Sequence, residues 1–282
     1  MRQLRSVEAV KASLRPLAAE GIRVGLVPTM GALHSGHLSL VEAVKKAGAE
    51  HVVASIFVNP KQFGPNEDLD RYPRDLEGDL LRLESVGCDA VFFPEPASMY
   101  PEGFQTTVSV SEVAKGLCGA HRPGHFDGVA TVVLKLFNIV RPDYAVFGEK
   151  DFQQLTVLRA LARDLNLDVE IIGAPLMRDS DGLALSSRNR MLSPEERARA
   201  LSISAGLRAA EALYAGGERG AGPLLNAVRT KLAAAKLQPE YLELRGSTDL
   251  APLRSADGPA VILVATRVGD TRLIDNLILR RP

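Results

Sequence analysis

The chain has 282 residues, of which 46% are hydrophobic and 24% are charged, proportions typical of a soluble globular protein. Lysine plus arginine and aspartate plus glutamate both number 34, so the chain has no net charge that would attract it to nucleic acid or to an anionic membrane surface. The length favours one large domain together with a smaller one.

Targeting and membrane segments are not indicated. The N-terminal sequence MRQLRSVEAVKASLRPL is interrupted by charges, unlike a signal peptide, and no apolar stretch approaches the length of a membrane span. Cys88 and Cys118 form no CxxC motif, which fits a reducing compartment and favours two small, buried hydrophobic side chains. We therefore expect a cytoplasmic protein.

Helical and strand patterns alternate through the first part of the chain. Helices are predicted at 5–20, from about 36 onward, at 75–85, near 112–117, at 129–140 and at 152–165; strands are predicted at 22–27, 51–57, 90–93, 106–110, 144–147 and 168–172. This alternation predicts a right-handed, mostly parallel sheet.

The character of the sequence changes near residue 176. Ser193 followed by Pro194 predicts a helix start, and two alanine-rich helices at about 194–214 and 221–236 precede strands at 241–244, 260–266 and 271–276. We therefore predict a Rossmann-like α/β domain at 1–176, with helices on both faces of its sheet, and a smaller C-terminal α+β lid domain at 177–282.

The stretch at 28–41, PTMGALHSGHLSLV, carries the clearest functional pattern. It joins a predicted strand to a predicted helix, where open α/β sheets bind ligands and a helix start offers N–H groups to an anion. His34 and His37 are three residues apart and can face the same space, while Gly31 and Gly36 allow close backbone approach. The stretch predicts a nucleotide-phosphate site. Zinc ligation by the two histidines is the weaker alternative, because zinc needs three or four ligands.

Three further segments carry polar or cationic residues suited to phosphates and small polar ligands. They are NPKQF at 59–63, GEKDFQQ at 148–154 and LALSSRNR at 183–190. Lys150 offers a mobile point charge, and Arg188 offers a planar fork for a triphosphate. A surface salt bridge is the alternative for Lys150, and a solvated linker is the alternative for 183–190. GxxxxGK[ST] does not occur, which argues against a P-loop kinase, and the dinucleotide-binding fingerprint GxGxxG is also absent.

These segments, together with HRPGHF at 121–126, resemble the pantothenate synthetase (pantoate–β-alanine ligase) family of HxGH-type nucleotidyltransferases, closely over about 20–195. The resemblance implies ATP-dependent condensation of (R)-pantoate with β-alanine to pantothenate through a pantoyl adenylate, with release of AMP and pyrophosphate. It also implies Mg²⁺ and a homodimer, with neither nucleic acid nor membrane as a partner. Two alternatives stay open: another HxGH nucleotidyltransferase, whose product retains AMP, and a non-catalytic nucleotide-binding protein.

The resemblance also implies roles for individual residues. His34, His37, Lys150 and Arg188 are the expected catalytic residues. Gln62, Asn59, Gln154 and Arg122 are expected at pantoate or β-alanine, and Asp79 matches an acidic position near the magnesium, although Gly78 replaces an acid seen in some members. The expected ATP-binding residues are Met30, Gly31, Ala32, Leu33, His34, Ser35, Gly36, His37, Gly148, Glu149, Lys150, Asp151, Met177, Leu185, Ser186, Ser187 and Arg188.

Overall fold

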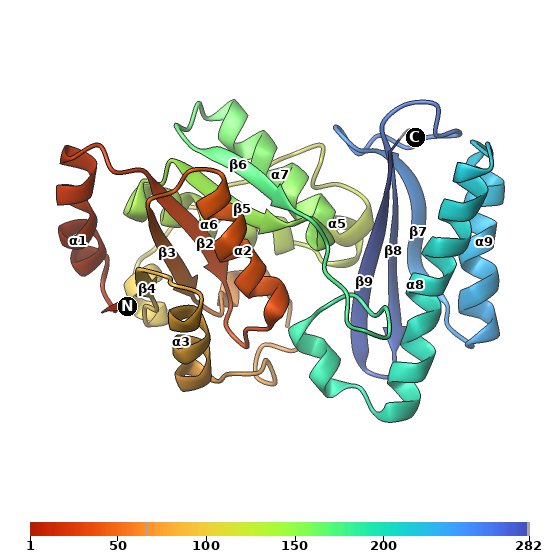
Figure 1. Ribbon diagram of the computed structural model, residues 1–282, viewed down its shortest axis with the longest axis horizontal. Helices are drawn as coiled ribbons and strands as arrows, with labels where there is room; N and C mark the ends of the chain where they lie inside the picture. Colours follow the sequence, from red (N-terminus) through yellow and green to blue (C-terminus); the bar gives the residue numbers. More distant parts are fainter. Residues whose placement is uncertain (66, 281–282) are drawn as a thin grey trace. The chain divides into compact units, whose positions relative to one another are not determined.

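The computed structural model describes residues 1–65 and 67–280, and the chain divides into two compact units (Figure 1). Unit 1 comprises Met1–Ala114, Arg122–Glu149 and Val157–Pro175. Unit 2 comprises Lys115–His121, Lys150–Thr156 and the chain from Leu176 onward. Unit 2 thus takes in two short segments from earlier in the sequence, and the domain boundary at 176/177 stays a prediction.

Unit 1 is built on a six-stranded sheet in which every neighbouring pair is parallel. Its strands are β1 (Arg2–Leu4), β2 (Val24–Thr29), β3 (His51–Ile56), β4 (Ala90–Phe92), β5 (Tyr144–Gly148) and β6 (Glu170–Ala174), in the order β1-β4-β3-β2-β5-β6. From β2 the chain continues to β3 and β4 on one side of β2, and then returns to the other side of β2 with β5 and β6. The topological switch point therefore lies between β2 and β5. The predicted parallel α/β sheet is confirmed.

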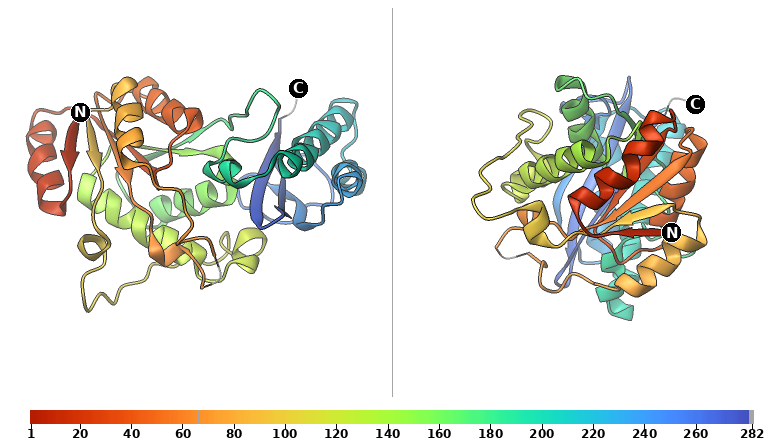
Figure 2. Two further views of the ribbon diagram at one scale, coloured as in Figure 1. Left: turned by 90° about the horizontal axis from the view of Figure 1, so that it is seen from below. Right: turned by 90° about the vertical axis from the view of Figure 1, so that its left-hand side faces the viewer.

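Helices cover both faces of this sheet (Figure 2). They are α1 (Val7–Ala19), α2 (Ser35–Lys46), α3 (Leu76–Ser85), α4 (Pro96–Met99), α6 (His125–Val140) and the greater part of α7 (Phe152–Asp164). Val41 and Val44 of α2 pack with Val52 of β3 in one buried cluster. At Gly25 of β2 a Cβ would lie 2.5 Å from Val44, so glycine is what lets α2 lie close to the sheet.

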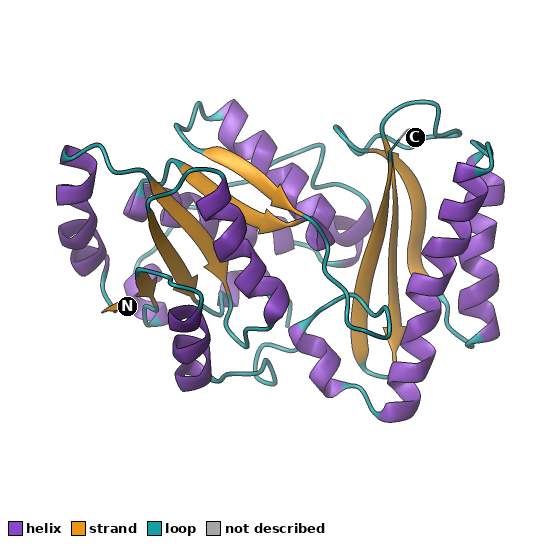
Figure 3. Cartoon of the chain, in the orientation of Figure 1, coloured by secondary structure: helices purple, strands orange, loops and turns teal. Residues whose placement is uncertain are grey.

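Unit 2 has its own antiparallel sheet, β7-β8-β9, with two long helices on one face (Figure 3). Its elements are α5 (Leu117–His121), α8 (Pro194–Ala215), α9 (Ala221–Ala234), β7 (Pro239–Gly246), β8 (Ala260–Val268) and β9 (Thr271–Leu279). The predicted cap of α8 is confirmed: Glu196 N–H donates to Ser193 Oγ at 3.2 Å, and Ser193 N–H donates to Glu196 Oε2 at 2.9 Å.

Two local predictions differ from the structure, and one short strand was missed. Residues 106–110 form no strand, although Val108 N–H donates to Thr131 Oγ1 at 2.9 Å. The half-buried Val108 and Val110 produce the alternating pattern of a strand, but no neighbouring strand in the described part of the chain pairs with them. The helix predicted near 112–117 begins instead at Leu117. The short strand β1 was not predicted. Within the described residues, no helix is both long enough and apolar enough to span a membrane.

Candidate active site

The predicted site residues are divided between the two units. Unit 1 carries the 30–37 turn, Asn59, Gln62, Asp79, Arg122, Gly148 and Glu149; unit 2 carries Lys150, Asp151, Gln154, Met177 and Leu185 to Arg188.

The turn after β2 is tightly built. Thr29 Oγ1 donates to the Ser55 carbonyl at 2.6 Å and accepts the Gly31 N–H at 3.2 Å. Gly31 and Ala32 both have positive φ, at 83° and 50°, and a Cβ at Gly31 would lie 3.0 Å from Asp79 Oδ2. Backbone conformation and close packing therefore both favour glycine at position 31.

Asp79 of α3 holds this turn by hydrogen bonds to its backbone. Its carboxylate accepts the Ala32 N–H and the Leu33 N–H, each at 2.7 Å, and its side chain is 1% exposed. Burial raises the pKa of Asp79, while the N–H groups of Leu33 and Ala32 lower it, and the net direction is upward. Both carboxylate oxygens thus serve the backbone of the turn. The magnesium role of Asp79 stays a prediction.

His34 and His37 face each other at the start of α2. Their ring centroids lie 4.0 Å apart, and the His34 N–H donates to His37 Nδ1 at 3.3 Å. Because Nδ1 accepts this bond, a neutral His37 carries its proton on Nε2. His37 is therefore arranged as a hydrogen-bond donor through Nε2, beside the helix N-terminus that favours anions.

Two predicted motifs follow the two strands that flank the switch point. The PTMGALHSGH turn continues from β2, and GEK continues from β5, whose residues Tyr144 and Ala145 pair with β2. A Cβ at Gly148, the last residue of β5, would meet open space. Open α/β sheets bind their ligands at this place, so the geometry favours a ligand against the turn and against the backbone of Gly148.

The NPKQF loop brings Gln62 to the turn. Gln62 Nε2 donates to Met30 Sδ at 3.2 Å, and Gln62 Oε1 accepts from Asn59 Nδ2 at 3.0 Å. Asn59 is 1% exposed and occupied by protein partners. Of the two predicted substrate contacts in this loop, Gln62 is therefore the better placed to meet a ligand.

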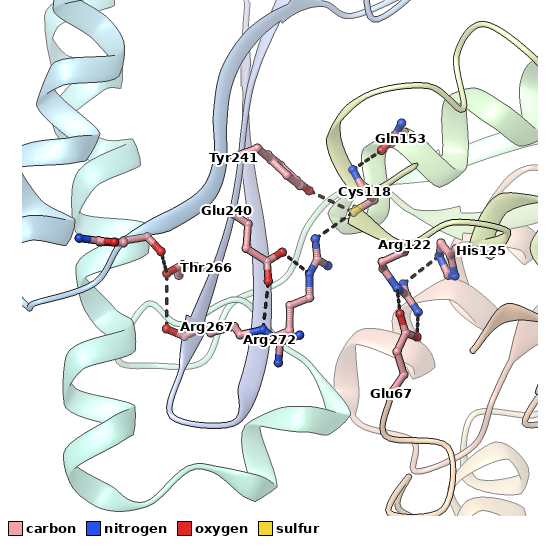
Figure 4. Close-up of polar contacts among 11 residues, drawn as sticks. Glu67, Cys118, Arg122, His125, Gln153, Glu240, Tyr241, Thr266, Arg267 and Arg272 are labelled. Carbon is pink, nitrogen blue, oxygen red and sulfur yellow. Dashed lines mark hydrogen bonds and ion pairs between the residues drawn. The ribbon is translucent and has the colours of Figure 1, made fainter. Parts of the chain in front are cut away.

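Arg122 is engaged with protein groups (Figure 4). Its Nε and Nη2 donate to the two carboxylate oxygens of Glu67, at 2.7 and 2.6 Å. Nη1 lies 2.9 Å from His125 Nε2, and Nη2 donates to the Gln62 carbonyl at 3.3 Å. Burial acts to raise the pKa of Glu67, but its bonds to Arg122 lower it, and the net direction is downward. Arg122 thus supports the Gln62 loop, and its contact with substrate stays a prediction.

In unit 2, the adjacent glutamines of α7 differ in their surroundings. Gln153 is buried, accepts the Cys118 N–H at 2.9 Å and donates to the Gly116 carbonyl at 3.3 Å. Cys118 is buried as predicted, but its Sγ lies 3.1 Å from the Tyr241 hydroxyl, so it is not merely a hydrophobic side chain (Figure 4). Gln154 is half-buried and has no side-chain hydrogen bond within the described part of unit 2. Of the two side chains, that of Gln154 rather than that of Gln153 is therefore available to contact a ligand.

Lys150 and the 177–188 loop are both fastened to β9. Asn276 Nδ2 donates to the Lys150 carbonyl at 3.0 Å. Asp275 accepts two bonds from Arg178, at 2.7 and 3.0 Å. Adjacent strand residues point to opposite faces of a sheet, so Asp275 and Asn276 hold different segments.

Neither Asp275 nor Asn276 was predicted as a site residue. The signal that could have indicated them is two consecutive buried polar residues within the apolar run LIDNLIL at 273–279.

The 177–188 loop folds back on itself as a narrow hairpin. Leu185 N–H donates to the Met177 carbonyl at 2.9 Å, and Arg178 pairs with Ala184. Ser186 Oγ accepts the Arg188 N–H at 3.3 Å. Met177 is 41% exposed, and its apolar side chain is suited to contact with a flat apolar ligand surface.

Comparison with known proteins covers nearly the whole chain. The family model described as pantoate-beta-alanine ligase matches residues 2–278. A pantothenate synthetase of Myxococcus xanthus (strain DK1622) is 56% identical over 279 residues, covering 98% of this chain and 95% of the relative.

Solved structures agree. A crystal structure of pantothenate synthetase from Thermus thermophilus superposes with a TM-score of 0.93 at 46% identity, covering 98% of this chain and 99% of that one. Pantoate-beta-alanine ligase from Francisella tularensis, complexed with beta-gamma ATP and beta-alanine, has a TM-score of 0.82 at 34% identity, covering 99% and 97%. By this likeness in sequence and fold, the chain belongs to the pantoate–β-alanine ligase family.

Proposed function

We propose that this chain, an ATP-dependent ligase of the pantoate–β-alanine family, joins (R)-pantoate to β-alanine through a pantoyl adenylate. The observation that carries the proposal is the HSGH turn at the switch point, with the His37 proton directed to Nε2 by the His34 N–H. This turn offers hydrogen-bond donors where a nucleotide phosphate is expected.

Activation is needed because a carboxylate does not acylate an amine directly. In the first step a pantoate carboxylate oxygen attacks the α-phosphorus of ATP, and the bond from that phosphorus to the β-phosphate oxygen breaks, releasing pyrophosphate. In the second step the neutral amine of β-alanine attacks the acyl carbon. AMP leaves with the electron pair of the broken C–O bond, and the amine loses a proton.

The protein's contribution to the first step is positioning and charge stabilisation. His37 Nε2–H is assigned to the charge developing on a phosphate oxygen, with His34 beside it. Lys150 is assigned to the bridging region of the triphosphate, and Arg188 with Ser186 and Ser187 to its outer phosphates. Gln62 and Gln154 are assigned to pantoate, and Gln62 also to β-alanine.

Magnesium is expected from the family resemblance, and the residues that the structure describes suggest how it would be held. Both oxygens of Asp79 accept backbone N–H groups, and no group of three His, Cys, Asp or Glu residues suited to a metal occurs within 1–65 and 67–280. Magnesium commonly arrives bound to nucleotide phosphates with few protein ligands. We therefore expect any Mg²⁺ to enter with ATP.

Phosphorus NMR tests the reaction class. The protein is incubated with ATP, Mg²⁺ and pantoate, before and after β-alanine is added. We expect free AMP and pyrophosphate to accumulate catalytically only after the amine is present. A stable AMP-bearing product would instead favour another HxGH nucleotidyltransferase, and unchanged ATP would contradict the proposed ligation.

Asn276→Asp tests whether the anchor of Lys150 matters to the reaction. A carboxylate oxygen in place of Nδ2 would face the Lys150 carbonyl, so one hydrogen bond becomes a repulsive contact. Loss of a hydrogen bond amounts to about 0.5–1.5 kcal/mol, so kcat/KM for ATP is expected to fall roughly 2- to 10-fold. Asn226→Asp, an exposed change of the same charge on α9, is the matched control. Equal kcat/KM values for the two variants would contradict the prediction.

We further propose that the chain works in the cytoplasm as a homodimer, as the family resemblance implies. Light scattering coupled to size-exclusion chromatography is expected to give about twice the chain mass of 30.3 kDa. A single-chain mass that does not change with concentration would contradict the dimer.

A further inference from the structure

The side-chain amide of Asn59 has only one orientation that suits its neighbours. Its Oδ1 accepts the Lys61 backbone N–H at 3.3 Å, and its Nδ2 donates to the Gly128 backbone carbonyl at 3.1 Å. A backbone N–H can only donate and a carbonyl can only accept. Exchanging the oxygen and nitrogen of Asn59 would therefore place donor against donor and acceptor against acceptor inside a buried site.

Tyr100 reinforces that orientation from outside the loop. Its hydroxyl donates to Asn59 Oδ1 at 2.7 Å. Burial raises the pKa of Tyr100 above its ordinary value, so the hydroxyl keeps its proton and remains a donor. The ring is held by Phe104 at a centroid distance of 5.1 Å, and the ammonium groups of Lys61 and Lys135 lie over the same pair of rings.

The orientation of Asn59 determines that of Gln62. The second N–H of Asn59 Nδ2 is directed to Gln62 Oε1 at 3.0 Å, so the Gln62 oxygen faces inward. Gln62 Nε2 then points to the 30–37 turn, where it donates to Met30 Sδ at 3.2 Å. A thioether is a weak acceptor, and an oxygen of a bound ligand would readily take over this donor.

The main chain of Gln62 is held as firmly as its side chain. Its carbonyl accepts from Arg122 Nη2 at 3.3 Å and from His125 Nδ1 at 2.9 Å. Helix α6 also lies directly against the loop at Gly128, where a Cβ would be 2.2 Å from the Lys61 carbonyl oxygen. With both ends fixed, Gln62 has little freedom to turn its amide over.

We propose that Tyr100, acting through Asn59, is a positioning residue that holds Gln62 as a hydrogen-bond donor toward the acid substrate. The matching group on the ligand is an oxygen acceptor, which is a carboxylate oxygen or the lone pair of a hydroxyl. This inference rests on the proposed function, because it takes the ligand at Gln62 to be pantoate. It adds the polarity of the contact and the residues that set it.

Gln62→Glu tests the polarity. Glutamate can still accept the Asn59 Nδ2–H through Oε1, so the inner bond is preserved, but the outer atom changes from a donor to a negatively charged acceptor. We expect the pantoate Kd, measured by calorimetry in the presence of a non-hydrolysable ATP analogue, to rise roughly 100-fold. Gln105→Glu, an exposed change of the same kind in unit 1, should leave it unchanged. Pantoate binding retained within about twofold in Gln62→Glu would overturn the donor assignment.

Tyr100→Phe tests the positioning role. Removing the hydroxyl takes away the shorter of the two hydrogen bonds to Asn59 Oδ1 and so loosens the Asn59–Gln62 pair. We therefore expect the KM for pantoate to rise roughly 5- to 10-fold while the KM for ATP changes less than twofold. Tyr144→Phe is the control, because that hydroxyl lies 3.5 Å from Arg23 at the amino end of β5. A merely structural tyrosine would alter both KM values together or neither, and either result would overturn the proposal.

Failure of this inference can be told apart from failure of the proposed function. If the wild-type protein does not form pantothenate, the function itself is wrong. If the wild type ligates normally and Gln62→Glu binds pantoate as well as wild type does, only the polarity of the contact is wrong.

Discussion

Turnover is expected to fall about 10²- to 10³-fold when His37 is replaced by alanine, the usual effect of removing one positioned donor from a developing negative charge. His37 Nδ1 accepts the His34 N–H at 3.3 Å, so the ring presents its Nε2 proton without having to choose between tautomers. The donor acts on charge that grows in the transition state. The loss should therefore appear mainly in kcat, with a smaller change in the KM for ATP.

His37→Gln separates the donor from the ring. A glutamine amide nitrogen reaches nearly as far as Nε2, so this variant should recover part of the lost turnover, whereas alanine should not. Single-turnover measurement of pyrophosphate release with ATP and pantoate reports the adenylation step directly. Turnover of His37→Ala within a few fold of wild type would remove His37 from the mechanism, and equal losses in the glutamine and alanine variants would leave the ring, rather than its proton, as the important feature.

The sequence could predict the sheet and the motifs because both depend on local patterns. The apolar runs before PTMGALHSGH and before GEKD become β2 and β5, and residues at the carboxyl ends of neighbouring parallel strands share one edge of the sheet. The pairing of β5 with β2, however, cannot be inferred from local sequence patterns. The switch point could be identified only once the strand order was available.

The residues that support the site could not be predicted from local sequence patterns either, because their contacts join positions that are far apart in the chain. Tyr100 reaches Asn59 across 41 positions, and Asn276 reaches Lys150 across 126. Gly128 gave no sign in the sequence of lying against the Lys61 carbonyl, because a glycine inside a helix has many explanations. Arg122 matched a motif, but only its bonds to Glu67 and to the Gln62 carbonyl indicate what its charge does within unit 1.

Asp79 has a structural role that its motif match did not predict. Its position was expected because of magnesium, yet both of its oxygens are occupied by N–H groups of the turn that leads to the histidines. A buried carboxylate that accepts two backbone donors fixes the path of the chain at those donors. In this position Asp79 holds the backbone at Ala32 and Leu33, immediately before α2 and its His37.

Asp79→Asn is accordingly expected to destabilise unit 1 and to disorder the turn. An asparagine has one acceptor oxygen where the carboxylate has two, so its NH₂ group must face either the Ala32 or the Leu33 N–H. Replacing one of the two bonds to the carboxylate with a contact between two donors costs about 1–3 kcal/mol, a large share of a typical folding stability of about 5–15 kcal/mol. Urea unfolding followed by circular dichroism should show the loss, and ATP affinity should fall with it. Glu77→Gln, on an exposed first-turn acid of the same helix, removes the same charge and should leave both quantities near wild type. Unchanged unfolding of Asp79→Asn would mean that the two N–H bonds are not what holds the turn.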